Sequence, residues 1–204
     1  MLSTLAKYIN NNFGSKRGLV ASLKYRLLFL AGFYKAYQHV DFKTVKCLVF
    51  VCSGNICRSS FGEHLARAKG LNATSYGLHC RGGDKADPRA IHEASIRGVD
   101  MGRHVTRNIS EYEPQKGELI LVMEPRHLVE LALKDVKYDQ VTIVPLWAEK
   151  PTPYLHDPIN SSDTFFSQCE SVVEQCIGKV QARLSAEENG EQSDVIVTNR
   201  KSSR

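Results

Sequence analysis

Residues 51–60 read VCSGNICRSS and bring thiol, hydroxyl and guanidinium side chains together in one short segment. Cys52 and Arg58 are separated by five residues, and Ser59 follows directly. A thiolate is a strong nucleophile, and an arginine offers a planar pair of N–H donors that matches two oxygens of a phosphate. The spacing therefore predicts a phosphate-binding loop with Cys52 as nucleophile and Ser59 as a hydroxyl donor to the thiolate.

This loop lies between a predicted strand and a predicted helix. The apolar run KCLVFVC at 46–52 is typical of a buried parallel strand, and FGEHLARAKG at 61–70 predicts a helix. The N–H groups and positive dipole end of a helix N-terminus bind a tetrahedral anion and stabilise a thiolate. Ser53 and Gly54 allow close approach of the backbone, and Asn55 tolerates the left-handed conformation where the loop curls.

The chain beyond this loop alternates between strand-like and helix-like segments. Strands are predicted at 73–79, 118–124 and 140–147, and helices at 88–98, 125–135 and 164–184. Such alternation predicts an α/β fold, with a four-stranded parallel sheet, helices on both faces and the phosphate-binding loop after strand 1. Ligands of these sheets bind beyond the carboxyl ends of the strands. Both the phosphate-binding loop and the proline-rich loop that holds Asp157 lie at that end.

The net charge of +5 is concentrated near the N-terminus. Residues 1–46 contain eight Lys or Arg and one acidic residue, so they carry +7 and the remainder carries −2. The domain itself is therefore not basic, which argues against a nucleic acid partner. We divide the chain into a basic amphipathic helical extension at 1–45, a domain at 46–185 and a polar tail at 186–204 that is predicted to be disordered.

The extension is predicted to form one extra N-terminal helix. Its apolar residues recur at steps of three and four: Leu19, Leu23, Leu27, Leu30, Tyr34 and Tyr37. Two interpretations stay open, namely peripheral contact of residues 16–40 with an anionic membrane surface and packing on the domain or on a second copy. No apolar run approaches the ~18 residues of a membrane span. Sparse cysteines and an N-terminus without a signal-peptide pattern favour the cytoplasm.

The segment VFVCSGNICRSSFGEHLAR closely resembles the signature of the low-molecular-weight protein tyrosine phosphatases. The resemblance continues, in the family's order of elements, through 75–90, 98–110, 118–131 and 156–165. It implies a phosphomonoesterase that dephosphorylates phosphotyrosine in proteins through a phosphocysteine intermediate. It also implies that no metal or other cofactor is needed and that a tyrosine kinase is the opposing partner.

The resemblance assigns roles residue by residue. Cys52 resembles the nucleophile, Arg58 the phosphate clamp and Asp157 the general acid. The supporting residues are Ser59, which steadies the thiolate, Asn55 and His104, which hold the shape of the loop, and Cys57, which forms a reversible disulfide with Cys52. The phosphate-binding loop comprises Ser53, Gly54, Asn55, Ile56, Cys57 and Arg58. From the residues alone Asp87 is a rival acid, although its place before Pro88 favours a helix cap.

The walls of the site depart from the family's pattern. Arg81, Ile159 and Asn160 stand where many members carry aromatic or large apolar residues that flank the substrate ring. Ile56 favours an aryl phosphate, because relatives that act on phosphoarginine carry threonine there. Two alternatives are kept: an arsenate reductase-like redox enzyme, for which Cys80 is a loose candidate as a further thiol, and a phosphate-binding protein with little turnover.

Overall fold

The computed structural model describes residues 2–201, and the side chains of residues 2, 3, 188 and 190–201 lie outside the description. The α-helices are α1 (Leu2–Phe13), α2 (Lys16–Leu30), α3 (Arg58–Ala68), α4 (Pro88–Ile96), α5 (Pro125–Leu133) and α6 (Asp163–Lys201). The strands are β1 (Cys47–Cys52), β2 (Ala73–Gly77), β3 (Glu118–Val122) and β4 (Gln140–Ile143). The short 3-10 helices are η1 (Lys35–Gln38), η2 (Phe42–Thr44), η3 (Ile109–Glu111) and η4 (Val144–Trp147).

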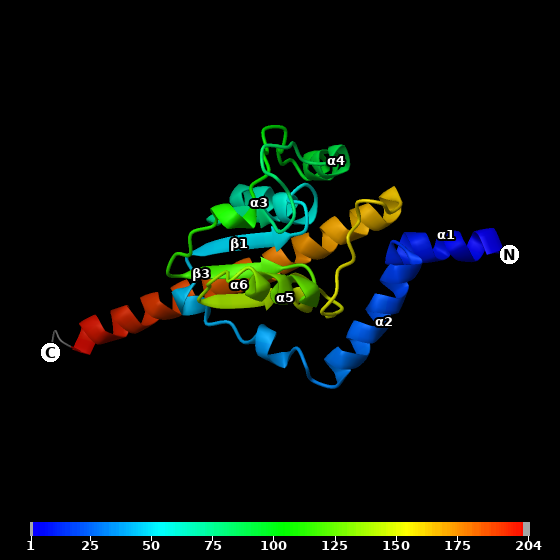
Figure 1. Cartoon of the computed structure of the whole chain (residues 1–204). Coiled ribbons are helices and arrows are strands. Elements are labelled where there is room, and N and C mark those ends of the chain that lie inside the picture. The colour runs from blue at the N-terminus through cyan, green and yellow to red at the C-terminus, as the bar shows by residue number, and fades with distance from the viewer. Residues whose placement is uncertain (1, 202–204) are drawn as a thin grey trace.

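The four strands form one parallel sheet in the order β2-β1-β3-β4 (Figure 1). Alternate residues of the central strand β1 enter two different cores. Leu48 and Phe50 pack with residues of α3, α4 and α6, whereas Val49 and Val51 pack with residues of α5 and with side chains that follow α2. The predicted α/β architecture with helices on both faces is therefore confirmed, and β1 delivers Cys52 to the carboxyl edge of the sheet.

Two predicted boundaries are wrong. The strand predicted at 140–147 ends at Ile143, and η4 follows, because Pro145 has no N–H to donate to a sheet ladder. At the other end of the chain, α6 continues to Lys201 where a disordered tail was predicted at 186–204. The segment extends a helix whose first half is packed on the core, and adding turns to an existing helix is easier than nucleating a new one; residues 202–204 lie outside the described range.

The extra N-terminal helix predicted for the extension is present as α2, and the structure adds α1 before it. Gly14, with φ of +72°, separates α1 from α2, and Gly32, with φ of +87°, lies just beyond the end of α2. Such φ values suit glycine and interrupt a helix. Tyr34 and Tyr37 therefore leave the predicted stripe and pack partly against the core on the β4 side, where the Thr142 hydroxyl donates to the Tyr37 carbonyl at 2.5 Å.

A carboxylic acid lies inside the packed half of α6. Glu170 is fully buried, and neither of its side-chain oxygens has a hydrogen-bond partner among the described residues. Burial raises the pKa of Glu170 to about 8, although the guanidinium of Arg58 acts in the opposite direction. Because a buried charge without a partner is very unfavourable, Glu170 is protonated in the folded protein at neutral pH.

Glu170→Gln is expected to stabilise the protein at alkaline pH and to leave it nearly unchanged at pH 5. The folded state holds the Glu170 proton up to about pH 8, whereas the unfolded chain releases it near pH 4.5. The wild-type protein must therefore lose stability as the pH rises through this window, on the order of a few kcal/mol in total. Urea denaturation of both proteins at pH 5 and pH 9 measures the difference in their free energies of unfolding. A difference of the same size at both pH values would contradict the conclusion that Glu170 is protonated in the folded protein.

Candidate active site

The predicted phosphate-binding loop occupies the connection between β1 and α3. Cys52 ends β1, and α3 begins at Arg58 rather than at the predicted residue 61. The Ser60 hydroxyl donates to the Cys57 carbonyl at 2.7 Å, which fits serine in the first turn of a helix. The earlier start places Arg58 and Ser59 in the first turn of α3, where free N–H groups face the loop.

The carbonyl groups of the loop point outward and are bonded by other segments. Four loop carbonyls accept hydrogen bonds from outside the loop. The backbone N–H groups of Leu78, His79 and Asp87 donate to the carbonyls of Cys52 (2.9 Å), Ser53 (2.8 Å) and Ile56 (2.8 Å), respectively. The His104 Nε2–H donates to the Asn55 carbonyl at 2.9 Å. The N–H groups of Gly54, Ile56 and Cys57 have no acceptor among the residues that the structure describes. Carbonyls held outward and N–H groups left free are the backbone arrangement of an anion site.

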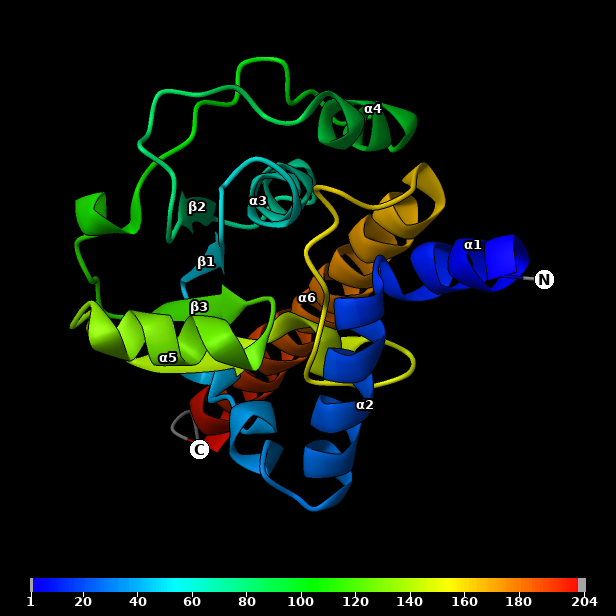
Figure 2. The same ribbon diagram turned by 45° about the vertical axis from the view of Figure 1, so that its right-hand side comes forward.

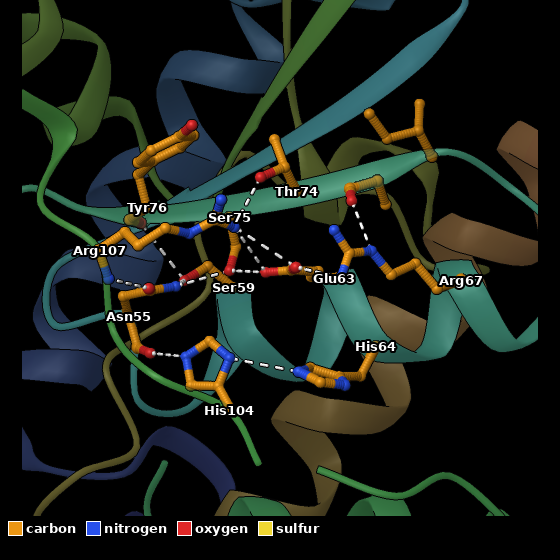
Figure 3. A network of polar contacts seen from close by, with 12 residues as sticks. Asn55, Ser59, Glu63, His64, Arg67, Thr74, Ser75, Tyr76, His104 and Arg107 are labelled. Carbon is orange, nitrogen blue, oxygen red and sulfur yellow. Dashed lines mark hydrogen bonds and ion pairs between the residues drawn. The ribbon is translucent and has the colours of Figure 1, made fainter. Parts of the chain in front are cut away.

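Asn55 is the centre of the network that holds this shape (Figure 3). Its φ of 56° is left-handed, as the sequence predicted. Its amide donates to the hydroxyls of Ser59 at 2.9 Å and Ser75 at 2.7 Å, and its oxygen accepts from the Arg107 N–H at 2.9 Å. All three side-chain bonds fix the curl of the loop and aim the Ser59 hydroxyl at Cys52.

Sequence reasoning missed the outer part of this network. The Ser75 hydroxyl donates to buried Glu63 at 2.5 Å, and the Arg107 guanidinium lies 3.3 Å from the same carboxylate. Glu63 is in α3, Ser75 in β2 and Arg107 in a loop, so no local pattern in the sequence links them (Figure 3). The network ties the loop to three separate elements.

His104 acts in this network as a neutral donor. Burial lowers the pKa of His104, although its bond to the Asn55 backbone favours the charged form. The Nε2–H donates to the Asn55 carbonyl at 2.9 Å, and Nδ1 lies 3.3 Å from His64 Nε2. The structure thus brings His104 to Asn55, although 49 residues separate them in the chain.

The two cysteines of the loop differ in their surroundings. The Cys52 sulfur lies 3.0 Å from the Ser59 hydroxyl and accepts from the Asn55 N–H at 3.3 Å. Cys57 is buried, and burial together with the nearby Cys52 raises the pKa of its thiol above the usual value. Cys57 therefore stays protonated while Cys52 is surrounded by donors that stabilise a thiolate.

Arg58 and Asp157 form an ion pair across the loop. The Arg58 side chain is 1% exposed, its Nη2 donates to Asp157 Oδ2 at 2.5 Å, and its Nη1 donates to the Leu155 carbonyl at 2.8 Å. Burial acts to lower the pKa of Arg58, but Asp157 and Cys52 outweigh it and the net shift is upward. The Arg58 Nε has no partner among the described residues, which leaves one N–H of the guanidinium available to an incoming anion.

A cavity of about 220 Å³ opens over the loop. Its floor consists of loop residues from Cys52 to Arg58, and its walls are His79, Asp157 and Ile159. Ile159 was predicted as a wall, whereas His79 was not among the predicted site residues. His79 reaches the cavity because β2 ends at Gly77, and its Nε2 pairs with Glu130 at 2.7 Å.

Arg81 and Asn160, the other predicted walls, are not among the residues that line this cavity. Asn160 lies in a turn closed by the Ser161 N–H and the Pro158 carbonyl at 3.0 Å, which leaves its side chain exposed. Arg81 is exposed in the loop that follows β2. The rival acid Asp87 accepts from the Arg89 N–H at 2.8 Å and caps α4, as its position before Pro88 predicted.

The sequence and the structure both match known phosphatases. The family model described as low molecular weight phosphotyrosine protein phosphatase matches residues 47–191. The chain therefore belongs to this family of cysteine-dependent enzymes, and its activity is the dephosphorylation of phosphotyrosine. The family resemblance that was identified from the residues around Cys52 is confirmed.

Individual relatives give the extent of the match. The low molecular weight protein-tyrosine-phosphatase Wzb of Salmonella typhi is 31% identical over 147 residues, which cover 69% of this chain and 95% of the relative. Etp of Escherichia coli K12, of the same description, is 29% identical over 141 residues, covering 68% and 94%. The crystal structure of the Erwinia amylovora tyrosine phosphatase AmsI superposes with a TM-score of 0.61 at 27% identity, covering 72% of this chain and 98% of that one.

Asn55→Ala is expected to weaken both substrate turnover and inhibition by inorganic phosphate. The change removes three buried hydrogen bonds and places alanine at a left-handed φ. Since an unpaired buried polar group costs about 1–3 kcal/mol, kcat/KM should fall by roughly tenfold or more. Asn72→Ala is the control, because its amide makes one long, exposed bond to Lys46. Unchanged kinetics in Asn55→Ala would show that the network does not shape the loop.

Proposed function

We propose that Cys52, Arg58 and Asp157 carry the phosphatase reaction. Arg58 and the N–H groups of the loop bind the phosphate, and Cys52 attacks the phosphorus. The S–P bond forms as the P–O bond to the tyrosine oxygen breaks, and the Asp157 carboxyl, whose place beside Arg58 the bound phosphate takes, gives a proton to that oxygen. The observation that carries this proposal is that Cys52 and Asp157 both line the small cavity next to Arg58.

The second step returns the enzyme to its starting state. A water molecule attacks the phosphorus, Asp157 accepts a proton from it, and the S–P bond breaks to release phosphate. The Ser59 hydroxyl, at 3.0 Å from the sulfur, stabilises the departing Cys52 thiolate. Cys57 protects Cys52 from over-oxidation by pairing with it in a reversible disulfide.

The proposed substrates are phosphotyrosine side chains of proteins, with a tyrosine kinase as the opposing partner. His79 and Ile159 provide the walls along which an aromatic ring would lie. The arsenate reductase alternative is less well supported, because Cys80 is not among the residues that line the cavity. A phosphate-binding protein with little turnover would not need Asp157 beside the phosphate site.

Asp157→Ala should slow a poor leaving group far more than a good one. Phenolate is a strong base that needs a proton as it leaves, whereas p-nitrophenolate leaves readily without one. The rate of product release in the first turnover should fall by roughly 100-fold or more with phenyl phosphate and much less with p-nitrophenyl phosphate. Cys52→Ser sets the background rate, and equal losses on both substrates in Asp157→Ala would exclude the acid role.

We also propose that α2 contacts an anionic membrane surface, in line with one of the two interpretations of the extension. The helix packs on the domain through one face and leaves an apolar row exposed: Val20 66%, Leu23 56%, Leu27 69%, Leu30 72% and Phe33 68%. Residues 1–40 contain six Lys or Arg and no acidic residue. Apolar side chains enter the headgroup boundary while each nearby cation adds about 1 kcal/mol with anionic lipid.

This contact would be peripheral. None of the helices within residues 2–201 has the length and apolar character to cross a bilayer. The proposed location is the cytoplasm, because a nucleophilic Cys52 with Cys57 close by needs a reducing compartment to stay reduced. The six cysteines are all free in the structure.

Leu27→Ser combined with Leu30→Ser should abolish vesicle binding. Each leucine that enters the membrane contributes roughly 1.5–3 kcal/mol to binding. In co-sedimentation, the double variant should therefore bind phosphatidylserine-containing vesicles at least about 100-fold more weakly than the wild-type protein. Leu133→Ser is the matched control, since Leu133 is 81% exposed and belongs to α5 rather than to the extension.

Two results would contradict the proposal that α2 contacts an anionic membrane surface. Equal binding to phosphatidylserine-containing and pure phosphatidylcholine vesicles would remove the role of the cations. A dimer in solution that the double variant dissociates would assign the exposed row to a second copy of the chain.

A further inference from the structure

The N-terminal extension lies directly against the loop that contains Asp157. Residues 150–162 connect η4 with α6 and run alongside α2 in Figure 2. The two faces of this loop are held differently. Leu155 and Asp157 are bonded by Arg58 from the cavity side, whereas Tyr154 and His156 contact the extension.

His156, the neighbour of Asp157 in the chain, is bonded on both ring nitrogens. Its Nε2 lies 2.9 Å from the Ser15 hydroxyl, and its Nδ1 lies 2.7 Å from the Tyr154 hydroxyl. Ser15 is also the N-cap of α2 and accepts from the Gly18 N–H at 2.9 Å. One hydroxyl therefore links the start of α2 to the residue that precedes Asp157.

A ring stack makes a second link. Tyr25 of α2 stacks on Tyr154, with ring centroids 5.1 Å apart and planes inclined by 26°. Offset stacks of this kind add attraction beyond the apolar area that they bury. Tyr25 fixes the Tyr154 ring, whose hydroxyl in turn contacts His156.

The close approach of the extension depends on two glycines. A Cβ at Gly14 would lie 2.7 Å from His156 Cδ2, and one at Gly18 would lie 2.9 Å from the same atom. Real Cβ atoms do not approach other atoms so closely, so the His156 ring sits against bare backbone at the junction of α1 and α2. Such close contact between the His156 ring and the backbone of the extension is typical of a packed interface rather than of a loosely tethered helix.

We propose that the extension positions the general acid: Ser15 and Tyr25 hold the outer face of the loop through His156 and Tyr154, so that Asp157 stays over the Cys52 cavity. The inference rests on the proposed acid role of Asp157. The extension is thus part of the scaffold of the active site as well as the bearer of an exposed apolar face. Ser15 and Tyr25 are positioning residues, since neither lines the cavity.

The test uses full-length Tyr25→Ala, which removes the stack but keeps a good helix former. First-turnover product release from phenyl phosphate should fall by about tenfold, because a misplacement of ~1 Å can cost as much as ~100-fold. Release from p-nitrophenyl phosphate should stay within about twofold, since that step needs little acid assistance. Tyr25→Phe keeps the ring and should restore the rate, and Tyr8→Ala, at an exposed site of α1, should have no effect.

The combination Tyr25→Ala with Asp157→Ala separates this inference from the proposed function. If Tyr25 acts through Asp157, the double variant should be no slower than Asp157→Ala alone. A further loss in the double variant, equal losses on both substrates, or no loss in Tyr25→Ala would each overturn the positioning role. Failure of Asp157→Ala to distinguish the two leaving groups would instead overturn the acid role itself.

Discussion

The active site depends on the neutralisation of one buried charge. Arg58 lies at the start of α3 with a side chain that is 1% exposed, and a guanidinium in such a place is tolerated only when it is paired and hydrogen-bonded. Asp157 and the Leu155 carbonyl supply the partners in the structure. A bound phosphate would supply the same negative charge, so one arginine both recognises the substrate and holds the loop that carries the proposed acid. The geometry of this pair connects the phosphate cradle, the acid loop and the extension that lies behind it.

The cradle itself is kept rigid by buried polar contacts. Asn55 donates to two hydroxyls and accepts from a backbone N–H, while Glu63 and Arg107 close the outer ring of the network. Networks of this kind strengthen in a low dielectric and are unfavourable when one member is missing. They keep the loop carbonyls turned outward before any anion arrives, so that binding does not have to reorganise the backbone.

The local pattern of the sequence was sufficient for some elements and not for others. The apolar run before Cys52 and the small polar residues after it predicted a strand, a curled loop and a left-handed Asn55, because each depends on near neighbours in the chain. The break at Gly14, the early start of α3 and the end of β4 before Pro145 were missed, because the spacing of apolar residues does not locate the ends of helices and strands to the residue. His79 was missed as a wall, and the predicted walls Arg81 and Asn160 are not among the residues that line the cavity, because the direction of a side chain after a strand depends on how the following loop turns.

What the sequence by itself determined is the chemistry. A thiol, an arginine six positions further on, a serine beside it and a distant Asp-Pro pair define the phosphatase family and its α/β fold, because the spacing of Cys52 to Ser59 is set within one loop. Only the tertiary structure decided what surrounds that chemistry: the Glu63–Arg107 support, the walls His79 and Ile159, and the contact of Ser15 and Tyr25 with the acid loop. These groups come from segments far apart in the chain, and their meeting depends on the packing of helices and loops around the sheet, which no local pattern records.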